Sequence, residues 1–230
     1  MNRWPILRYL LSSHTVVLVG FLLGVYLLVA VIVAVAAMFT EVTVSGVDIA
    51  GQVLPWLAAG YGYSAAALLS TVLTHGRTRR EFLAQHPVFL LVTAGLLAVV
   101  ATGAYAVEAV VYRAAGWTRT FQDQRVFEAG DYPLILLAYV SMLAVWMMTG
   151  ALLGGAFYRD EGGGLLALLP AAVLLSVSGG ANGFLSLPFT RWGLTSAPEV
   201  AVVTVVAVAA GWALLWAALR DVPLRTRVAS

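Results

Sequence analysis

The chain has neither lysine nor cysteine among its 230 residues, and these two absences exclude large parts of protein chemistry. Without lysine there is no P-loop lysine, Schiff base or lysine nucleophile. Without cysteine there is no disulfide, thiolate catalysis or cysteine-ligated zinc. Charge is scarce as well: charged residues make up 10% of the chain, whereas a soluble protein would carry about 25%.

Catalytic signatures are also missing. The sequence contains no HExxH motif, no GxSxG motif and no paired aspartates within its apolar runs. The three histidines, His14, His75 and His86, all fall at predicted ends of membrane helices, where they do not assemble a buried site. We therefore expect no catalytic residue, no metal site and no cofactor on this chain. Nothing in the chain points to nucleic-acid binding either.

What the chain has in abundance is apolar sequence: 61% of its residues are hydrophobic. A helix needs about 20 apolar residues to cross the hydrocarbon, and bilayer-spanning backbone must satisfy its own hydrogen bonds. We predict an all-α membrane protein with a single transmembrane domain over residues 1–230. Its six spans are Thr15–Phe39, Gly51–Leu73, Val88–Tyr112, Leu134–Phe157, Leu165–Ala181 and Glu199–Leu219.

The distribution of arginine predicts the orientation. With both termini in the cytoplasm, nine arginines lie inside and four outside, as the positive-inside rule requires. The inner set is Arg3, Arg8, Arg77, Arg79, Arg80, Arg159, Arg220, Arg225 and Arg227, and the outer set is Arg113, Arg119, Arg125 and Arg191. The arginine-rich, lysine-free composition is typical of a GC-rich bacterial genome. We therefore expect a multi-pass protein of a bacterial cytoplasmic membrane.

Residues 1–14 precede the first span and carry Trp4, Leu7 and Leu11 on one helical face, with Pro5 near the helix start. This pattern predicts an interfacial helix on the cytoplasmic surface. The alternative is a disordered tail. The following apolar run is too long for a signal-peptide core, so we interpret it as a retained first span.

The fifth span is irregular. Gly179, Gly180, Asn182 and Gly183 interrupt it, and an apolar-aromatic stretch, Phe184–Trp192, follows before Pro198. A short helix that re-enters the membrane from the outer face fits this pattern, provided protein or water covers its backbone. A plain outer loop with an aromatic belt is the alternative.

Polar side chains inside the spans have two interpretations. Tyr61, Tyr63, Tyr139, Ser141 and Trp146 could line a substrate path, but local interhelical hydrogen bonds explain them equally well. Of the ionisable groups in the spans, Glu108 and Glu199 are the candidates for ion coupling. For both, we favour interfacial residues that pair or cap a helix.

Glycine pairs at GxxxG spacing, Gly20 with Gly24 and Gly150 with Gly154, allow close helix packing. Packing within the subunit is the default interpretation of both pairs, and a dimer seam is the alternative.

A basic loop, Thr74–Pro87, separates the second and third spans and contains the sequence HGRTRREF. The chain resembles the transmembrane subunits of ABC-2 type exporters. The residues that carry the resemblance are Gly76, Arg79, Arg80 and Phe82 of this loop. The predicted topology agrees with it, since it has six spans, an amphipathic first helix and a broken fifth span. Those proteins have the type V ABC transporter fold. Larger members of that family carry a big extracellular domain, which this chain lacks.

The resemblance implies a specific division of labour. This chain would form the translocation path and hydrolyse nothing, while ATP and Mg would bind a separate ABC ATPase subunit. The coupling helix that docks on that partner would comprise Gly76, Arg77, Arg79, Arg80, Glu81 and Phe82, with the Phe82 ring as apolar anchor. The arginines would bind partner carboxylates or lipid phosphates. A second permease subunit, identical or related, is also implied.

Two other functions stay open from the sequence. One is a non-transport membrane protein that binds a peptide or another membrane protein, such as an immunity protein. The other is an ion-coupled carrier that uses Glu108. The sequence does not indicate the substrate.

Overall fold

The computed structural model describes residues 4–66, 68–121, 126–183 and 196–221. Within these ranges the chain forms eight helices and a single isolated β-bridge. The helices are α1 (Pro5–Ala36), α2 (Gly46–Gly51), α3 (Leu54–Ala66), α4 (Leu69–Thr74), α5 (Arg79–Ala115), α6 (Tyr132–Arg159), α7 (Glu161–Asn182) and α8 (Ala197–Leu219). Six helical segments are long and apolar enough to cross a membrane, which confirms the predicted number of spans.

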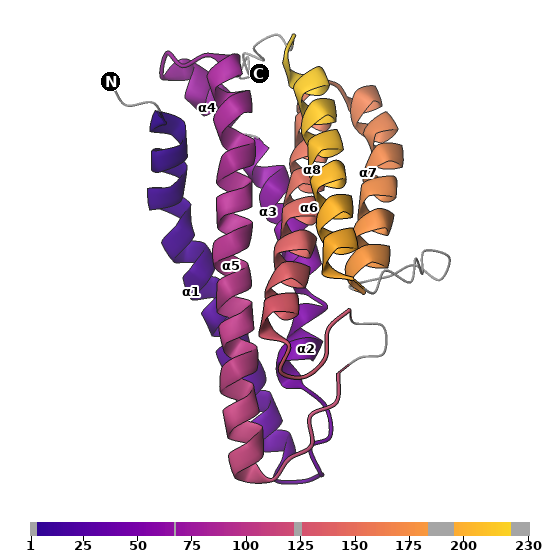
Figure 1. Cartoon of the computed structure of the whole chain (residues 1–230). Coiled ribbons are helices and arrows are strands. Elements are labelled where there is room, and N and C mark those ends of the chain that lie inside the picture. The colour runs from indigo at the N-terminus through magenta and orange to yellow at the C-terminus, as the bar shows by residue number, and fades with distance from the viewer. Residues whose placement is uncertain (1–3, 67, 122–125, 184–195, 222–230) are drawn as a thin grey trace.

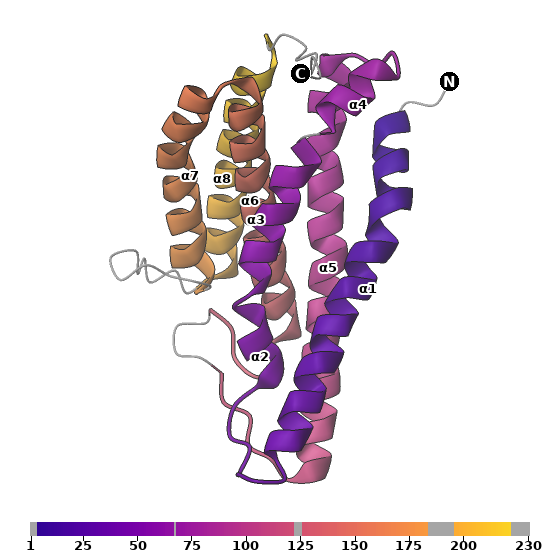
Figure 2. The same ribbon diagram turned by 180° about the vertical axis from the view of Figure 1, so that it is seen from behind.

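The two longest helices, α1 and α5, run side by side in the same direction (Figures 1 and 2). Their register is fixed at one end by a hydrogen bond between Ile6 and Gln85, which are 79 residues apart. Their last residues, Ala36 and Ala115, are separated by the same number of residues, so the two helices also end at about the same level.

Helix α6 is the centre of the bundle and packs against α3, α5, α7 and α8. Glycine makes the closest of these approaches possible. A Cβ added at Gly150 would lie 2.0 Å from the carbonyl oxygen of Ala59, and one added at Gly154 would lie 2.5 Å from that of Tyr63. The Gly150/Gly154 pair therefore packs α6 on α3 inside the subunit. Gly20 and Gly24 on α1, in contrast, have no atom within 4 Å of an added Cβ.

The helices begin and end at other residues than the predicted spans. The first span and residues 5–14 form one continuous helix, α1, rather than an interfacial helix followed by a span. The second predicted span is divided into α2, α3 and α4, and α5 begins at Arg79, nine residues before the predicted start of the third span. The predicted third span, Val88–Tyr112, lies entirely within α5, and the charged residues Arg79–Glu81 form the first turn of the same helix.

The predicted break in the fifth span occurs later than expected. Helix α7 continues through Gly179, Gly180 and Asn182, and it ends at Gly183, whose φ of +74° is the left-handed conformation typical of a helix C-terminus. The predicted re-entrant stretch, Phe184–Trp192, lies outside the described residues.

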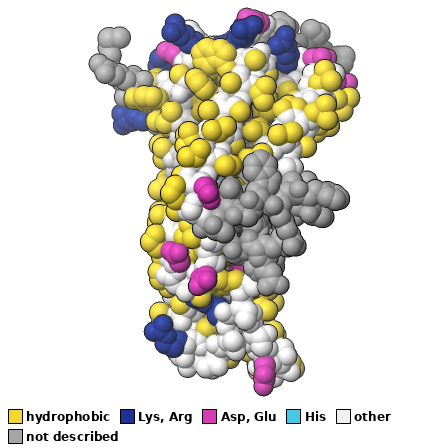
Figure 3. Space-filling view, turned by 45° about the vertical axis from the view of Figure 1, so that its right-hand side comes forward, with side chains coloured by type: hydrophobic (Ala, Val, Ile, Leu, Met, Phe, Trp, Pro, Cys, Tyr) yellow, Lys and Arg dark blue, Asp and Glu magenta, His cyan; other side chains and the backbone are white. Residues whose placement is uncertain are grey.

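The two halves of the bundle differ in length. At 1.5 Å per residue, the 37 residues of α5 extend about 55 Å, whereas the 22 residues of α7 extend about 33 Å. In both ribbon views α7 and α8 stop well short of the level that α1 and α5 reach (Figures 1 and 2). Figure 3 shows basic side chains gathered at the end that carries α4, above a belt of hydrophobic side chains.

Candidate functional site

The segment Gly76–Glu81, which follows α4 and includes the first three residues of α5, is here named the arginine segment. Gly76 adopts φ +73°, which reverses the chain direction after α4 at little cost for a residue without a Cβ. Thr78 then caps α5: its Oγ1 accepts a hydrogen bond from the Glu81 N–H at 3.2 Å, and Glu81 Oε2 accepts one from the Thr78 N–H at 2.9 Å. This capping box holds the segment in one conformation.

The guanidinium groups of the segment are accessible. Arg77 and Arg80 are exposed, and Arg79 is half-buried. Arg77 Nη1 lies 3.9 Å from Glu81 Oε1, and both side chains are more than 40% exposed. A surface ion pair at this distance contributes little to stability, so the arginines of the segment are not held by strong internal bonds of this kind.

Phe82 does not fit its expected role as the apolar anchor for a partner. Its side chain is fully buried, and its ring stacks on the ring of His86 with centroids 4.7 Å apart. The residue is a part of the chain's own core. A partner that docks on this end would meet Gly76, the arginines and Glu81, but not the Phe82 ring.

The first turns of α5 are tied to two other helices. Gln85 is buried, and its Oε1 accepts hydrogen bonds from the N–H groups of Ile6 at 3.0 Å and Leu7 at 3.1 Å. These N–H groups belong to the first turn of α1, which has no partners of its own within the helix. From the other side, Trp212 Nε1 of α8 donates to the carbonyl of Leu83 at 3.0 Å. A displacement of the arginine segment therefore acts directly on α1 and α8.

A second cluster of polar groups is buried near the far end of α5. Glu108 is 7% exposed, and it accepts hydrogen bonds from Ser45 Oγ at 2.6 Å and from the Val47 N–H at 2.9 Å. The Tyr112 hydroxyl accepts from the Gly46 N–H at 3.2 Å and donates to the Val44 carbonyl at 3.0 Å. Both side chains thus hold the start of α2 against α5. The loop before α2 is joined to the loop after α5 by a bridge between Val44 and Thr120.

The cluster continues into the bundle. The Tyr105 hydroxyl donates to Asp48 Oδ1 at 2.9 Å and lies 3.2 Å from the hydroxyl of Tyr139. Arg119 Nη1 donates to the Tyr105 carbonyl at 2.9 Å, and the Arg119 guanidinium lies over the ring of Phe121. The end of the bundle away from α4 therefore contains one hydrogen-bonded network with two buried carboxylates, those of Asp48 and Glu108.

The interpretation of Glu108 and Glu199 as capping residues is confirmed in its main point. Glu199 forms a capping box with Ser196 at the start of α8, and Glu108 caps α2 from α5. Glu108 is buried, however, and not interfacial as expected. Within the described residues, no group of three or more His, Cys, Asp or Glu side chains could hold a metal ion.

The five residues predicted as a substrate path do not converge on one surface. Tyr139 belongs to the network of Asp48 and Tyr105, and Ser141 is hydrogen-bonded to Thr204 of α8. Trp146 packs edge-on against Trp56, with ring centroids 5.2 Å apart. Tyr63 is 46% exposed beside Phe157, while Tyr61 faces α1 and α5. For Tyr139 and Ser141, the interpretation as local interhelical bonds describes what the structure contains.

Buried polar atoms without a hydrogen-bond partner gather where α1, α3 and α5 meet. They include both ring nitrogens of His86 and the hydroxyls of Thr15, Tyr61 and Thr93. The rings of His14, Tyr61 and His86 all lie within 6.4 Å of the ring of Phe89, measured between centroids. Unsatisfied buried groups are costly, and ordered water is the usual partner for such atoms.

Sequence reasoning missed most of these residues. The capping box was visible as Thr-x-x-Glu, a known signature of a helix start, and it would have placed the start of α5 correctly. Gln85, Trp212 and the network of Asp48 with Tyr105 carry no local signal, because each joins segments that are far apart in the chain.

Comparisons of the chain with protein-family models, with curated proteins and with solved structures give no match.

Proposed function

We propose that this protein is the membrane-spanning subunit of an ATP-driven exporter, which forms the translocation path and couples to a separate ATP-binding subunit. The observation that carries the proposal is the arginine segment. It is exposed and basic, it has a fixed conformation, and it is joined to α5 within a bundle of six apolar helices. These are the properties required of a coupling element that transmits the motion of a soluble partner.

In this proposal the end of the bundle that carries the arginine segment faces the cytoplasm. The positive-inside rule supports this orientation, since the start of α1, Arg77–Arg80 and the end of α8 lie at the same end (Figure 1). ATP and Mg bind the partner, and this chain contributes no catalytic group.

Coupling follows from the hydrogen bonds at that end. When the partner ATPases close, they push on Arg79 and Arg80. The capping box transmits the displacement to the first turns of α5, and Gln85 transmits it to α1. Arginine is suited to the contact because its guanidinium makes bidentate, charge-assisted hydrogen bonds with partner carboxylates. A second membrane subunit, identical or related, completes the path in the proposed assembly.

The test is a mild-detergent pull-down of the tagged chain from its native host, followed by an ATPase assay of the eluate. We expect a stoichiometric ATP-binding partner with the wild-type chain and its loss with the double variant Arg79→Ala/Arg80→Ala. Arg220→Ala is the matched control, since it removes an exposed arginine near the same end but outside the segment. A clean preparation with no ATPase would overturn the proposal and favour a non-transport binding or immunity function.

An ion-coupled carrier is the second candidate, and the burial of Glu108 is the observation that favours it. Transport into vesicles that contain this chain alone, driven by an ion gradient and abolished in Glu108→Gln, is the outcome that would replace the exporter proposal.

A further inference from the structure

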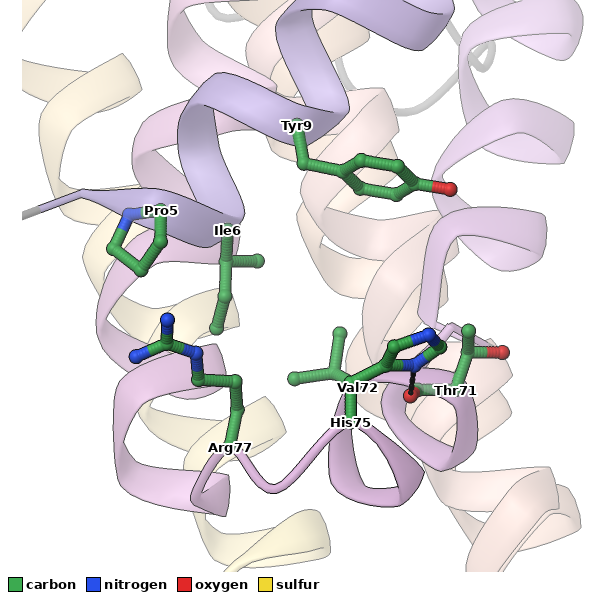
Figure 4. Close-up of a pocket in the computed structure, with 7 residues that line it drawn as sticks. All are labelled: Pro5, Ile6, Tyr9, Thr71, Val72, His75 and Arg77. Atoms are coloured by element: carbon green, nitrogen blue, oxygen red, sulfur yellow. Dashed lines mark hydrogen bonds between the residues drawn. The ribbon is translucent and has the colours of Figure 1, made fainter.

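A pocket of about 200 Å³ lies between the first two turns of α1 and the helix α4 (Figure 4). Its lining residues are Pro5, Ile6, Tyr9, Thr71, Val72, His75 and Arg77. Ile6 and Val72 are buried and form an apolar floor, while Tyr9 and Arg77 are exposed at the rim. The pocket therefore combines an apolar interior with a basic edge.

The polar atoms at the rim are suited to an anion that carries hydroxyl groups. The Arg77 guanidinium lies 3.9 Å from the Glu81 carboxylate, which is too far for a hydrogen bond, so Glu81 does not occupy its N–H donors in this way. His75 Nδ1 lies 2.7 Å from the Thr71 carbonyl, and since a carbonyl only accepts, Nδ1 carries the proton. With Nδ1 occupied by the Thr71 carbonyl, Nε2 is the ring nitrogen left to form a hydrogen bond with a ligand hydroxyl.

The surroundings indicate where such a ligand comes from. The pocket lies at the start of α1 and beside α4, and the arginines Arg8, Arg77 and Arg80 near it in the chain are exposed. Figure 3 shows that basic side chains gather at the end that carries α4, next to the hydrophobic belt. Tyr9 is 59% exposed, as is typical of an aromatic side chain at a membrane–water interface. A ligand at this boundary meets lipid on one side and basic groups on the other.

We propose that this pocket binds an anionic phospholipid with a hydroxyl-bearing headgroup. The phosphate accepts charge-assisted hydrogen bonds from the Arg77 guanidinium. A headgroup hydroxyl forms a hydrogen bond with His75 Nε2, and the glycerol backbone with the first methylenes of one chain lies on Ile6 and Val72. The proposal does not depend on the exporter function. It shares Arg77 with the arginine segment, but it makes no use of Arg79 and Arg80, the two residues on which the partner ATPases are proposed to push.

A bound lipid at this position would join two elements that have few other contacts. α1 and α4 are the two walls of the pocket, and α4 directly precedes the arginine segment. The lipid would therefore stabilise the arginine segment against α1, in addition to the bond made by Gln85.

The experiment measures lipid adducts on the purified full-length chain by native mass spectrometry during titration with phosphatidylglycerol, with phosphatidylcholine and with inorganic phosphate. Arg77→Gln removes the proposed phosphate ligand. Arg80→Gln is the matched control, because it removes one exposed charge three residues away without touching the pocket. Thr71→Phe fills the pocket and leaves the charge unchanged.

We expect phosphatidylglycerol to bind in preference to phosphatidylcholine. Loss of a charge-assisted bond should weaken this binding roughly tenfold or more in Arg77→Gln, with a change of less than about twofold in Arg80→Gln. Thr71→Phe should abolish the preference. If Arg77→Gln and Arg80→Gln weakened phosphatidylglycerol binding equally, the attraction would be nonspecific and the proposal would be overturned. Displacement of the lipid by inorganic phosphate would also overturn it, since the site would then be one for small anions.

Discussion

The hydrogen bonds from Gln85 to the start of α1 allow a sharp prediction. Replacing Gln85 with leucine keeps a similar volume but removes the acceptor, so the Ile6 and Leu7 N–H groups lose their partner. The loss of a helix N-terminal acceptor costs about 0.5–2 kcal/mol, and leaving a buried donor unsatisfied falls in the same range. We expect Gln85→Leu to lower the free energy of local unfolding at the start of α1 by about 1–2 kcal/mol. This corresponds to a roughly 5- to 30-fold larger population in which the first turns of α1 are unfolded.

Hydrogen–deuterium exchange of the chain in detergent or nanodiscs measures this population directly, through the exchange rates of residues 6–10. Gln85→Glu is the matched control. It retains an acceptor oxygen and places a negative charge at a helix N-terminus, so exchange there should stay close to that of the wild type or slow down. The reasoning would be refuted if residues 6–10 exchanged at the wild-type rate in Gln85→Leu. It would also be refuted if Gln85→Glu opened α1 as much as leucine does.

Three further predictions test other parts of the structure. Phe82→Ala should destabilise the chain by about 3–5 kcal/mol, because it empties a fully buried site, whereas Arg80→Ala should change the unfolding free energy by less than about 0.5 kcal/mol in the same detergent titration. Gly150→Ala should lower the midpoint of thermal unfolding by forcing α6 away from the Ala59 backbone, at a cost of about 1–3 kcal/mol or more; Gly20→Ala, with open space around its Cβ, should leave the midpoint within error. Glu108→Leu should lower the unfolding free energy by about 3–5 kcal/mol, and Glu108→Gln should lower it less, since the amide oxygen still accepts the Val47 N–H. Equal losses of unfolding free energy in the two variants would contradict the capping role.

Hydrophobic length made the six spans predictable, because the bilayer requires about 20 apolar residues whatever their order. The continuity of the predicted coupling helix with the third span was not predicted, for a physical reason. Arg79 and Arg80 are charged, so composition assigns them to a loop, although the capping box of Thr78 with Glu81 begins a helix there.

The role of Phe82 shows the limit for the candidate site. The resemblance implied that Phe82 is an exposed anchor for a partner, but Phe82, His86 and Phe89 follow helical spacing and share the buried face of α5. The tyrosine–carboxylate network was beyond prediction for another reason. Its members Asp48, Tyr105 and Tyr139 come from three helices, and no pattern within one segment reports a contact between segments.

The unequal lengths of the helices have a consequence for the lipid around the protein. Transmembrane helices tilt by up to about 40°, and such a tilt shortens the projection of a 55 Å helix only to about 42 Å. α5 therefore exceeds a hydrocarbon layer of about 30 Å, while α7, at about 33 Å, matches it. Along α1, exposed apolar side chains continue to Met38 and Phe39, so the mismatch is hydrophobic and falls on one side of the protein. A bilayer whose hydrocarbon layer matches the helix lengths on both sides of the protein would be thicker beside α1 and α5 than beside α7 and α8. The protein would then partition into regions where the membrane thickness changes, such as the boundary between a thick and a thin lipid domain. Its distribution between such domains would measure this preference.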